Sequence, residues 1–267
     1  MFWNVFLAQQ TKILKQRIVW IELVLLAGLV ALISAAPYIV GDQNAAGSRN
    51  LSLTREVADL VATMGEATIG GLLVVILAGT ATAQEYSWRS LHQWLSNGVS
   101  RLVFLGGKFA SLLLPLVLIP ATALVVATPV TAFFLQRQQG TLGSLTEHLP
   151  DMLLTVPLAA YALMPYAAMA VLLAVAGRSM ATAIGGGLAF TLVVENLASQ
   201  LLMVLGGSAA KLVAYLPSGF ARGLLGSGPE GGPELFPAPV AAAGIAAYTA
   251  LFFVAALWIL RRQDLSD

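Results

Sequence analysis

Apolar residues gather in six long stretches, and charged or turn-forming residues separate each stretch from the next. The stretches are approximately Ile18–Val40, Ile69–Ala83, Phe109–Leu135, Met152–Ala176, Met180–Leu205 and Val240–Leu260. They are too long for ordinary strands and lack the alternation of a membrane β-strand. Because every backbone amide in lipid needs a hydrogen-bond partner, we interpret them as membrane-spanning helices. The second stretch is the shortest, and we expect it to extend back through Met64–Thr68.

Composition restricts the class of protein further. Hydrophobic residues make up 58% of the chain and charged residues 10%, whereas a soluble domain has about 45–50% apolar and about 25% charged residues. So few charges cannot cover a water-facing surface, which excludes a cytosolic enzyme, a nucleic-acid-binding module and a disordered protein. We therefore predict an all-α polytopic membrane protein with six transmembrane helices, in which residues 1–267 form a single transmembrane domain.

The positive charges favour one orientation. With both termini in the cytoplasm, the inner segments hold Lys12, Lys15, Arg17, Arg89, Arg101, Lys108, Arg178, Arg261 and Arg262. The outer segments then hold the smaller set Arg49, Arg55, Arg137, Lys211 and Arg222. This excess follows the positive-inside rule. We expect a multi-pass protein of the cell inner (plasma) membrane with cytoplasmic N- and C-termini.

Two amphipathic segments lie on the predicted cytoplasmic side. Residues 1–17 place Phe2, Trp3, Phe6 and other apolar side chains on one helical face, with lysines opposite, which is typical of an interfacial helix. This helix either anchors the N-terminus or also contacts a cytoplasmic partner. Residues 84–101 carry a second apolar stripe, which consists of Trp88, Leu91, Leu95, Val99 and Leu102. We expect a helix there that either lies on lipid or docks another protein.

The second segment also resembles a known family. It reads A-Q-E-Y-S-W-R-S-L-H-Q-W-L-S-N-G-V-S-R, continues to L-G-G-K, and is similar to the first cytoplasmic loop of ABC-2-type ABC transporter permeases. Members have an acidic residue after span two, a leucine, a serine-arginine pair and then a lysine. The C-terminal Leu260–Leu265 and the N-terminal connecting helix are also similar. One departure is Ser87-Trp88-Arg89, where many members have Gly-Thr after the acid.

The resemblance implies a homodimer or pseudo-dimer that works with an ABC ATPase subunit in trans. The chain would contact a second copy or a related permease and membrane lipid, but no nucleic acid. It would not be an enzyme and would hold no cofactor, because the partner ATPase would bind ATP and Mg. The absence of a G-x-x-x-x-G-K-[ST] phosphate loop agrees with this. The predicted ATPase-docking residues on this coupling helix are Glu85, Trp88, Arg89, Leu91, Trp94, Leu95 and Arg101.

Two acids interrupt the apolar stretches. Glu22 lies one turn into the first span, where we expect it to reach the interface or to pair with Arg17 or Lys15. Glu195 lies near the middle of the fifth span, and it forms one polar face with Asn196, Ser199 and Gln200. Because a carboxylate in lipid is unfavourable, this face would line a pathway or a dimer interface. The alternatives are structural hydrogen bonds between helices or a misplaced span boundary.

Residues 206–239 form an unusual outer segment. Its first part is apolar around Pro217-Ser218-Gly219, and its second part is rich in glycine and proline and indicates a linker. The family resemblance implies re-entrant outer helices between spans five and six, with Tyr215, Pro217 and Phe220 at an outer gate. A plain surface loop is the alternative.

The function that these observations favour is the permease subunit of an ATP-driven ABC exporter, which moves a lipophilic or amphipathic substrate outward. Two alternatives remain open. The chain could be an ion-coupled secondary transporter that uses Glu195, or it could be an ABC ion exporter. A membrane-embedded enzyme is disfavoured, because no Ser–His, Asp–Asp or His–Asp set lies within one leaflet.

Overall fold

The computed structural model describes residues 2–40, 53–88, 90–139, 149–227 and 236–263, and all regular elements in these residues are helical. Among them, six helical segments are long and apolar enough to cross a membrane, which confirms this part of the prediction. They are α2 (Arg17–Val40), α5 (Ile69–Ser87), α7 (Arg101–Gln139), α8 (Leu149–Ala162) with α9 (Met164–Gly177), α10 (Met180–Leu188) with η1 (Ala189–Val194) and α11 (Glu195–Leu205), and α14 (Ala238–Arg262).

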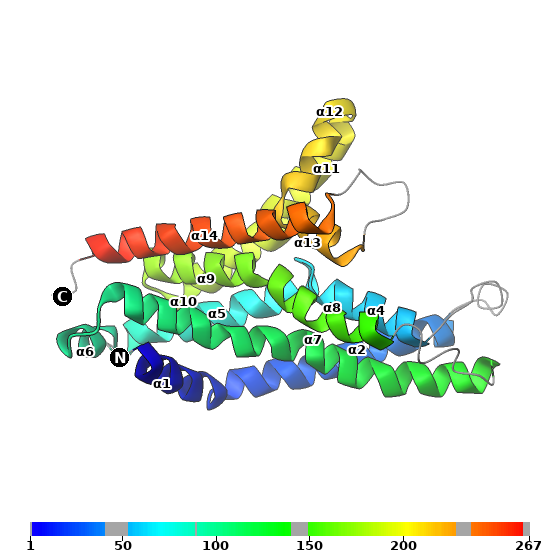
Figure 1. Ribbon diagram of the computed structural model, residues 1–267, viewed down its shortest axis with the longest axis horizontal. Coiled ribbons are helices and arrows are strands. Elements are labelled where there is room, and N and C mark those ends of the chain that lie inside the picture. The colour runs from blue at the N-terminus through cyan, green and yellow to red at the C-terminus, as the bar shows by residue number, and fades with distance from the viewer. Residues whose placement is uncertain (1, 41–52, 89, 140–148, 228–235, 264–267) are drawn as a thin grey trace.

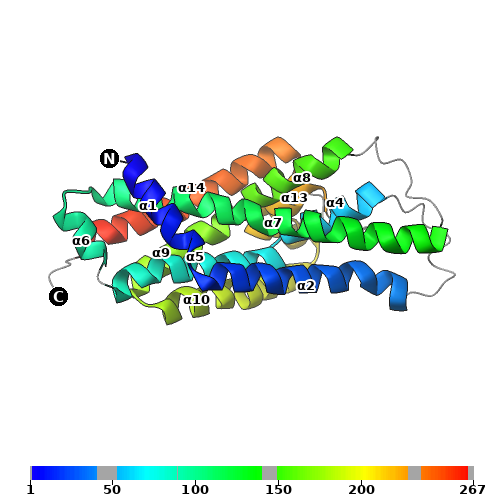
Figure 2. The same cartoon turned by 90° about the horizontal axis from the view of Figure 1, so that it is seen from below.

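Helix α9 occupies the centre of the bundle. It packs along α5, α10 and α14, as Figures 1 and 2 show. Its buried side chains are mostly small, and Ala167, Ala168, Ala170 and Ala174 are fully buried. Small residues allow helix backbones to approach closely in a membrane protein. The sequence of α9 therefore favours a position in which several helices surround it.

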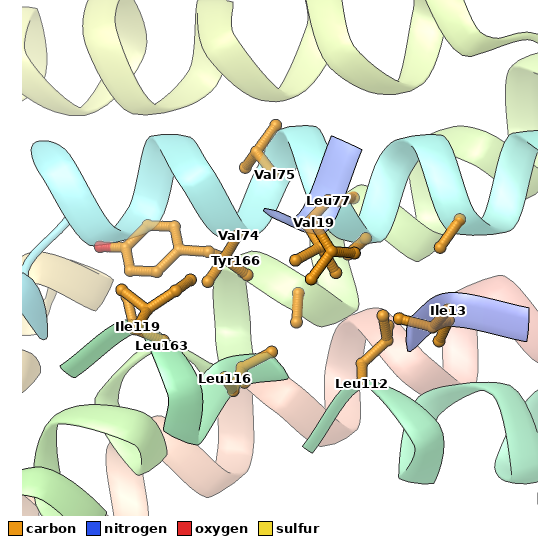
Figure 3. Packing of buried hydrophobic residues seen from close by; sticks show 14 of the residues in the cluster. Ile13, Val19, Val74, Val75, Leu77, Leu112, Leu116, Ile119, Leu163 and Tyr166 are labelled. Atoms are coloured by element: carbon orange, nitrogen blue, oxygen red, sulfur yellow. The ribbon is translucent and has the colours of Figure 1, made fainter. Parts of the chain in front are cut away.

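Helix α7 forms the other wall of the core. Figure 3 shows its Ile119 beside Leu163 at the α8–α9 junction, and its Leu112 beside Ile13 of the N-terminal helix. On its other sides α7 packs against α1 (Phe2–Leu14), α2 and α4 (Leu53–Met64). The apolar core thus continues along α7 and connects the N-terminal helices to the central helix α9.

Both ends of the chain lie at the same end of the bundle (Figures 1 and 2), which we call the termini end. Helix α1, the short helix α6 (Ser90–Ser96) and the last turn of α14 are located there. Helices α4 and α13 (Pro217–Leu225) lie toward the opposite end. An even number of membrane-length segments places the two termini at the same end, because each segment reverses the direction of the chain.

The second span begins later than the sequence suggested. Helix α4 ends at Met64, residues 65–68 form a turn, and α5 begins at Ile69. The predicted continuation through Met64–Thr68 is therefore wrong. The backbone reverses so tightly that a Cβ at Gly70 would overlap the carbonyl oxygen of Met64. Helix α5 gains its length at the other end instead, where it continues to Ser87.

The prediction of one helix over residues 84–101 is wrong in extent. The first residues of this segment complete α5, α6 covers only Ser90–Ser96, and α7 begins at Arg101. Gly98, which has φ +79, lies in the turn between α6 and α7. Glycine adopts this left-handed conformation without the steric penalty that a Cβ brings. The chain therefore turns twice between the second and third spans.

The fifth span contains a wide turn. Residues Ala189–Val194 form a π-helix between α10 and α11. Along this span the buried residues recur every fourth position, at Ala183, Gly187, Thr191 and Glu195. Beyond the wide turn, α11 and the four-residue α12 (Gly207–Ala210) project away from the other helices (Figure 1). The chain then returns through the short 3-10 helix η2 (Lys211–Tyr215) to α13.

Candidate functional site

A buried ionic cluster surrounds Glu85 at the termini end. The Lys12 and Lys108 ammonium groups donate to Glu85 Oε1 at 2.8 and 2.9 Å, and the Ser90 hydroxyl donates to Oε2. Glu85 and Lys108 are 1% and 0% exposed. Buried charges are tolerated when they are paired and hydrogen-bonded. One carboxylate therefore holds four elements together, namely α1, α5, α6 and α7.

Lys108 has a second partner within this cluster. Its ammonium group also donates to the Oε1 atom of Gln9, which is fully buried on α1, at 2.8 Å. Next to the cluster, the Gln16 amide donates to Gln84 Oε1 at 2.7 Å. These contacts fix α1 and its junction with α2 against the ends of α5 and α7. Sequence analysis named Glu85 but did not identify its partners.

The predicted docking residues around α6 are not presented as one outward ridge. Leu91 is 2% exposed and belongs to the apolar core, while Trp94 and Leu95 are half-buried against it. Trp88 lies in the turn before α6 and is 59% exposed, and the Lys12 ammonium lies 4.9 Å from its ring centroid. The predicted residue Arg89 lies outside the described residues. Trp88 is thus the predicted apolar docking residue that faces outward.

Arg101 connects α7 to the C-terminal end of α14. Its guanidinium donates to the carbonyl oxygens of Leu260 at 2.8 Å, Gln263 at 3.0 Å and Arg261. Carbonyl groups at the end of a helix lack partners within the helix, and a cation there is favourable. Arg101 was predicted to lie on the coupling helix, but it is the first residue of α7.

Gln263 extends this connection to two more helices. Its amide group donates to the carbonyl oxygen of Val175 on α9 at 2.6 Å, and its Oε1 atom accepts from the Tyr86 hydroxyl on α5 at 3.2 Å. Gln263 is 7% exposed. The termini end therefore contains two adjoining polar connections, one around Glu85 and one around Gln263 and Arg101. Each connection includes a residue that lies a few positions from α6 in the sequence, Glu85 in the first and Arg101 in the second.

A second buried carboxylate, Glu195, lies at the start of α11. It is 3% exposed. The Tyr166 hydroxyl on α9 lies 3.2 and 3.1 Å from its two oxygens, and the backbone N–H of Ser218 donates to Oε1 at 2.6 Å. Ser218 is the second residue of α13, where backbone N–H groups are free to bind an acceptor. Glu195 thus joins three helices without an ion pair among the described residues.

The other end of α13 is held by a separate contact. Arg222 Nε donates to Glu66 Oε2 at 3.3 Å, and the Ser227 hydroxyl donates to Glu66 Oε1 at 2.9 Å. Glu66 lies in the tight turn between α4 and α5. Helix α13 is therefore fixed by Glu195 near its N-terminus and by Glu66 near its C-terminus.

The predicted polar face around Glu195 is divided. Asn196 and Gln200 are exposed, whereas Glu195 is buried and Ser199 is half-buried. The Asn196 amide donates to the carbonyl oxygens of Thr191 and Leu192 in its own helix. The Ser199 hydroxyl donates back to the Glu195 carbonyl oxygen at 2.8 Å. Glu195 is thus covered by other helices of the chain, while Asn196 and Gln200 remain exposed, and the role of this face in a pathway or dimer interface stays a prediction.

The predicted outer-gate residues lie close together. Pro217 is the first residue of α13 and is buried, Phe220 is 8% exposed, and Tyr215 is 53% exposed. The Phe236 ring contacts both aromatic residues, edge-on to Tyr215 at 4.8 Å and stacked on Phe220 at 5.4 Å. Phe220 also packs against Gly244 of α14 so closely that a Cβ there would overlap its ring. Part of the predicted linker, residues 228–235, lies outside the described residues.

Glu22 does not form the pair that we expected. It is 7% exposed, and neither carboxylate oxygen has a hydrogen-bond partner among the described residues. Neither Arg17 nor Lys15 reaches it within ion-pair distance in that part of the chain. A buried carboxyl group without partners is unfavourable in its ionised form. The structure therefore separates Glu22 from both polar connections at the termini end.

The polar contacts at both sites join helices that are distant in the sequence. Within the described residues, no group of three His, Cys, Asp or Glu side chains is placed to hold a metal ion. No protein-family model and no curated protein matches the chain. The arrangement of the polar connections is therefore the main guide to function.

Proposed function

We propose that this chain is the membrane-spanning permease subunit of an ABC exporter of the ABC-2 type. It would work with a separate ATPase subunit, which binds ATP and Mg, and with a second copy or a related permease. Its cargo would be a lipophilic or amphipathic molecule that moves outward. The observation that supports this most is the connection of α6 to α1, α5 and α7 through Glu85.

A partner that pushes on α6 would act on several helices at once. Ser90, the first residue of α6, hydrogen-bonds to Glu85, and Glu85 binds Lys12 on α1 and Lys108 on α7. A few residues later, Arg101 connects the start of α7 to the end of α14. In this proposal α6 is a cytoplasmic coupling helix that receives the motion of the ATPase. The exposed ring of Trp88 beside it is the contact that we assign to the partner.

The charges and the N-terminal helix support a cytoplasmic termini end. Among the described residues, this end carries Lys12, Lys15, Arg17, Arg101, Lys108, Arg178, Arg261 and Arg262, and the rest of the structure carries the smaller set Arg55, Arg137, Lys211 and Arg222. Such an excess marks the cytoplasmic side. Trp3 and Leu7 of α1 are 69% and 57% exposed, which suits a helix that lies in the membrane interface.

At the opposite end, α13 suits a re-entrant outer gate. Its N-terminal half is buried, and it is held by Glu195 on one side and by Glu66 on the other. In an exporter, release of either contact would let α13 move relative to α9. Because Glu195 lies between α9, α11 and α13, we assign to it the role of holding the gate closed.

The proposal can be tested by co-expression with a candidate ABC ATPase subunit from the same genome. We expect the purified complex to hydrolyse ATP faster than the ATPase alone. The Trp88→Glu variant should insert normally but lose most of the bound ATPase. The control is Gln93→Glu, which adds the same charge at an exposed position of α6. If Trp88→Glu retains its ATPase as Gln93→Glu does, the docking assignment is wrong.

An ion-coupled secondary transporter is a second candidate, and one observation favours it. The fourth span is interrupted at Leu163 and the fifth by the π-helix Ala189–Val194, and Glu195 directly follows this π-helix. Interrupted helices around a buried carboxylate are typical of such transporters. Proteoliposomes that contain this chain alone and an imposed proton gradient would distinguish the two. If the chain transports without an ATPase, and if Glu195→Gln abolishes this transport, the second candidate is favoured over the first.

A further inference from the structure

A groove lies between α9 and α10 near the termini end. Its volume is about 610 Å³, and it is shallow and mostly open to its surroundings. Its lining consists of Leu173, Ala176, Gly177, Ala181, Thr182, Gly185 and Gly186. Both helices belong to membrane-length segments. In the membrane, this groove therefore opens toward lipid or toward another protein.

The groove exists because small residues line it. Gly177, Ala181 and Gly185 recur every fourth position through the α9–α10 turn, so no large side chain fills the space. A Cβ placed on Gly185 would meet no heavy atom within 4 Å, whereas one on Gly186 would approach Leu173 at 3.3 Å. Gly185 therefore lies in the open part of the groove, and Leu173 forms part of its wall.

The chemistry of the lining suits an aliphatic chain. Its only side-chain hydroxyl, on Thr182, already donates to the Ser179 carbonyl oxygen at 3.0 Å. No polar side chain of the lining is left to bind a polar molecule. An acyl chain needs no hydrogen bonds and can follow such a groove, while a polar cargo would lose its hydration there without compensation.

The end of the groove carries positive charge. Arg178 follows the lining residue Gly177, is exposed, and holds the left-handed backbone conformation with φ +50. Among the described residues, no carboxylate forms an ion pair with it. Helix α10 begins two residues later with Ser179 as its N-cap, and the N-terminus of a helix also attracts anions. Arginine binds phosphate oxygens well.

We propose that this groove binds one phospholipid with an anionic head group. Its acyl chain would lie over Gly185 and Ala181, and its phosphate would contact Arg178 and the first turn of α10. Charge complementarity favours this occupant over a second copy of the chain, because an apolar helix would leave Arg178 unpaired. The inference does not depend on the ATPase, so it stands or falls separately from the proposed transport function.

Native mass spectrometry of the purified chain tests the proposal. The protein would be incubated with equal amounts of palmitoyl-oleoyl phosphatidylglycerol and phosphatidylcholine, and the lipid adducts counted. We expect wild type to retain one phosphatidylglycerol preferentially. The Gly185→Leu variant should lose that adduct, because a Cβ at Gly185 meets no heavy atom within 4 Å and the leucine side chain would occupy the groove. The matched control is Gly28→Leu on α2, another exposed helical glycine with open space around it.

A second variant separates the head group from the chain. Arg178→Asn removes the charge, and asparagine tolerates the left-handed conformation. It should lower the preference for phosphatidylglycerol about tenfold or more, because a charge-assisted hydrogen bond is lost. Arg137→Gln, which removes an exposed arginine from the far end of α7, should leave the preference unchanged. Equal adducts in wild type and both test variants would overturn the proposal. A loss of dimers in Gly185→Leu, without a change in lipid adducts, would overturn it in favour of a second copy.

Discussion

Glu85 and Glu195 are buried to a similar degree, but different groups satisfy them. Glu85 accepts from two lysine ammonium groups as well as from the Ser90 hydroxyl, so two of its partners carry full charges. Glu195 accepts from a tyrosine hydroxyl and a backbone N–H, so its partners are neutral. Both carboxylates join helices that are distant in sequence, one at the termini end and one beside α13.

This difference indicates different mechanical roles. Breaking a buried ion pair leaves an uncompensated charge, so the connection at Glu85 should stay closed while the fold is intact. Separating the neutral donors from Glu195 would leave only the carboxylate without partners and would strand no buried cation, so we expect that connection to open with a smaller penalty than the one at Glu85. We therefore expect the termini end to move as a unit and α13 to be the more mobile element.

The largest effect is expected from Glu85→Gln. This change leaves Lys108 fully buried beside Lys12 without a counter-charge, and loss of one partner of a buried pair typically destabilises by about 3–5 kcal/mol. The variant should unfold at a clearly lower temperature in detergent and should release α1. The measurement is thermal unfolding, with limited proteolysis near the N-terminus as a second readout.

The double variant Glu85→Gln/Lys108→Met provides the control. Methionine removes the stranded charge and keeps much of the volume, so part of the lost stability should return. If the double variant loses as much stability as the single variants Glu85→Gln and Lys108→Met lose when added together, the two side chains are not coupled. The contrast with Glu195 would then lose its basis.

A smaller effect is expected from Glu195→Leu. This change strands the Tyr166 hydroxyl and the Ser218 N–H, and an unsatisfied buried donor costs about 1–3 kcal/mol. Glu195→Gln should cost less, because its amide oxygen can still accept from Ser218. Hydrogen exchange at α13 would measure both. Equal protection of α13 in wild type and Glu195→Leu would show that the carboxylate does not hold this helix.

The smallest effect is expected from Arg101→Gln. A cation at the C-terminal end of a helix contributes typically 0.3–1 kcal/mol when exposed and up to about 2 kcal/mol when partly buried. We expect a loss of about 1 kcal/mol and faster exchange in the last turn of α14. A loss as large as that of Glu85→Gln would place Arg101 in the ionic cluster rather than beside it.

Much of the fold was predictable because lipid imposes a simple requirement. Stretches such as Ile18–Val40 must satisfy their own backbone hydrogen bonds, so hydropathy alone locates the spans. Helix α4 was not predicted, because Arg55, Glu56 and Asp59 interrupt the apolar pattern between the first two spans. Its signal was present, since Val57, Val61 and Met64 recur at helical spacing and are buried.

The candidate site was harder to predict because its partners are distant in sequence. Lys12 and Glu85 are separated by 73 residues, and Glu195 and Ser218 by 23 residues that contain the projecting α11 and its return. Periodicity assigns a residue to a helical face, but it does not say which helix that face meets. This is why Glu195 was expected to share its surroundings with Gln200, from which it is turned away.

The π-helix in the fifth span affects where along this span the chain can tolerate an insertion or a deletion. In an ideal α-helix, residues four apart drift by about 40° around the axis, so Ala183 and Glu195 would face about 120° apart. A π-helix has roughly 4.4 residues per turn, and the six residues Ala189–Val194 cancel most of that drift. Deletion of one residue there would restore regular α-helix, and the remaining eleven steps of about 100° would still leave Glu195 only about 20° from the direction of Ala183. Deletion of one residue from the regular helix α10 would instead turn Glu195 by about 100°, away from Tyr166 and Ser218, so the wide turn tolerates a change in chain length better than α10 does.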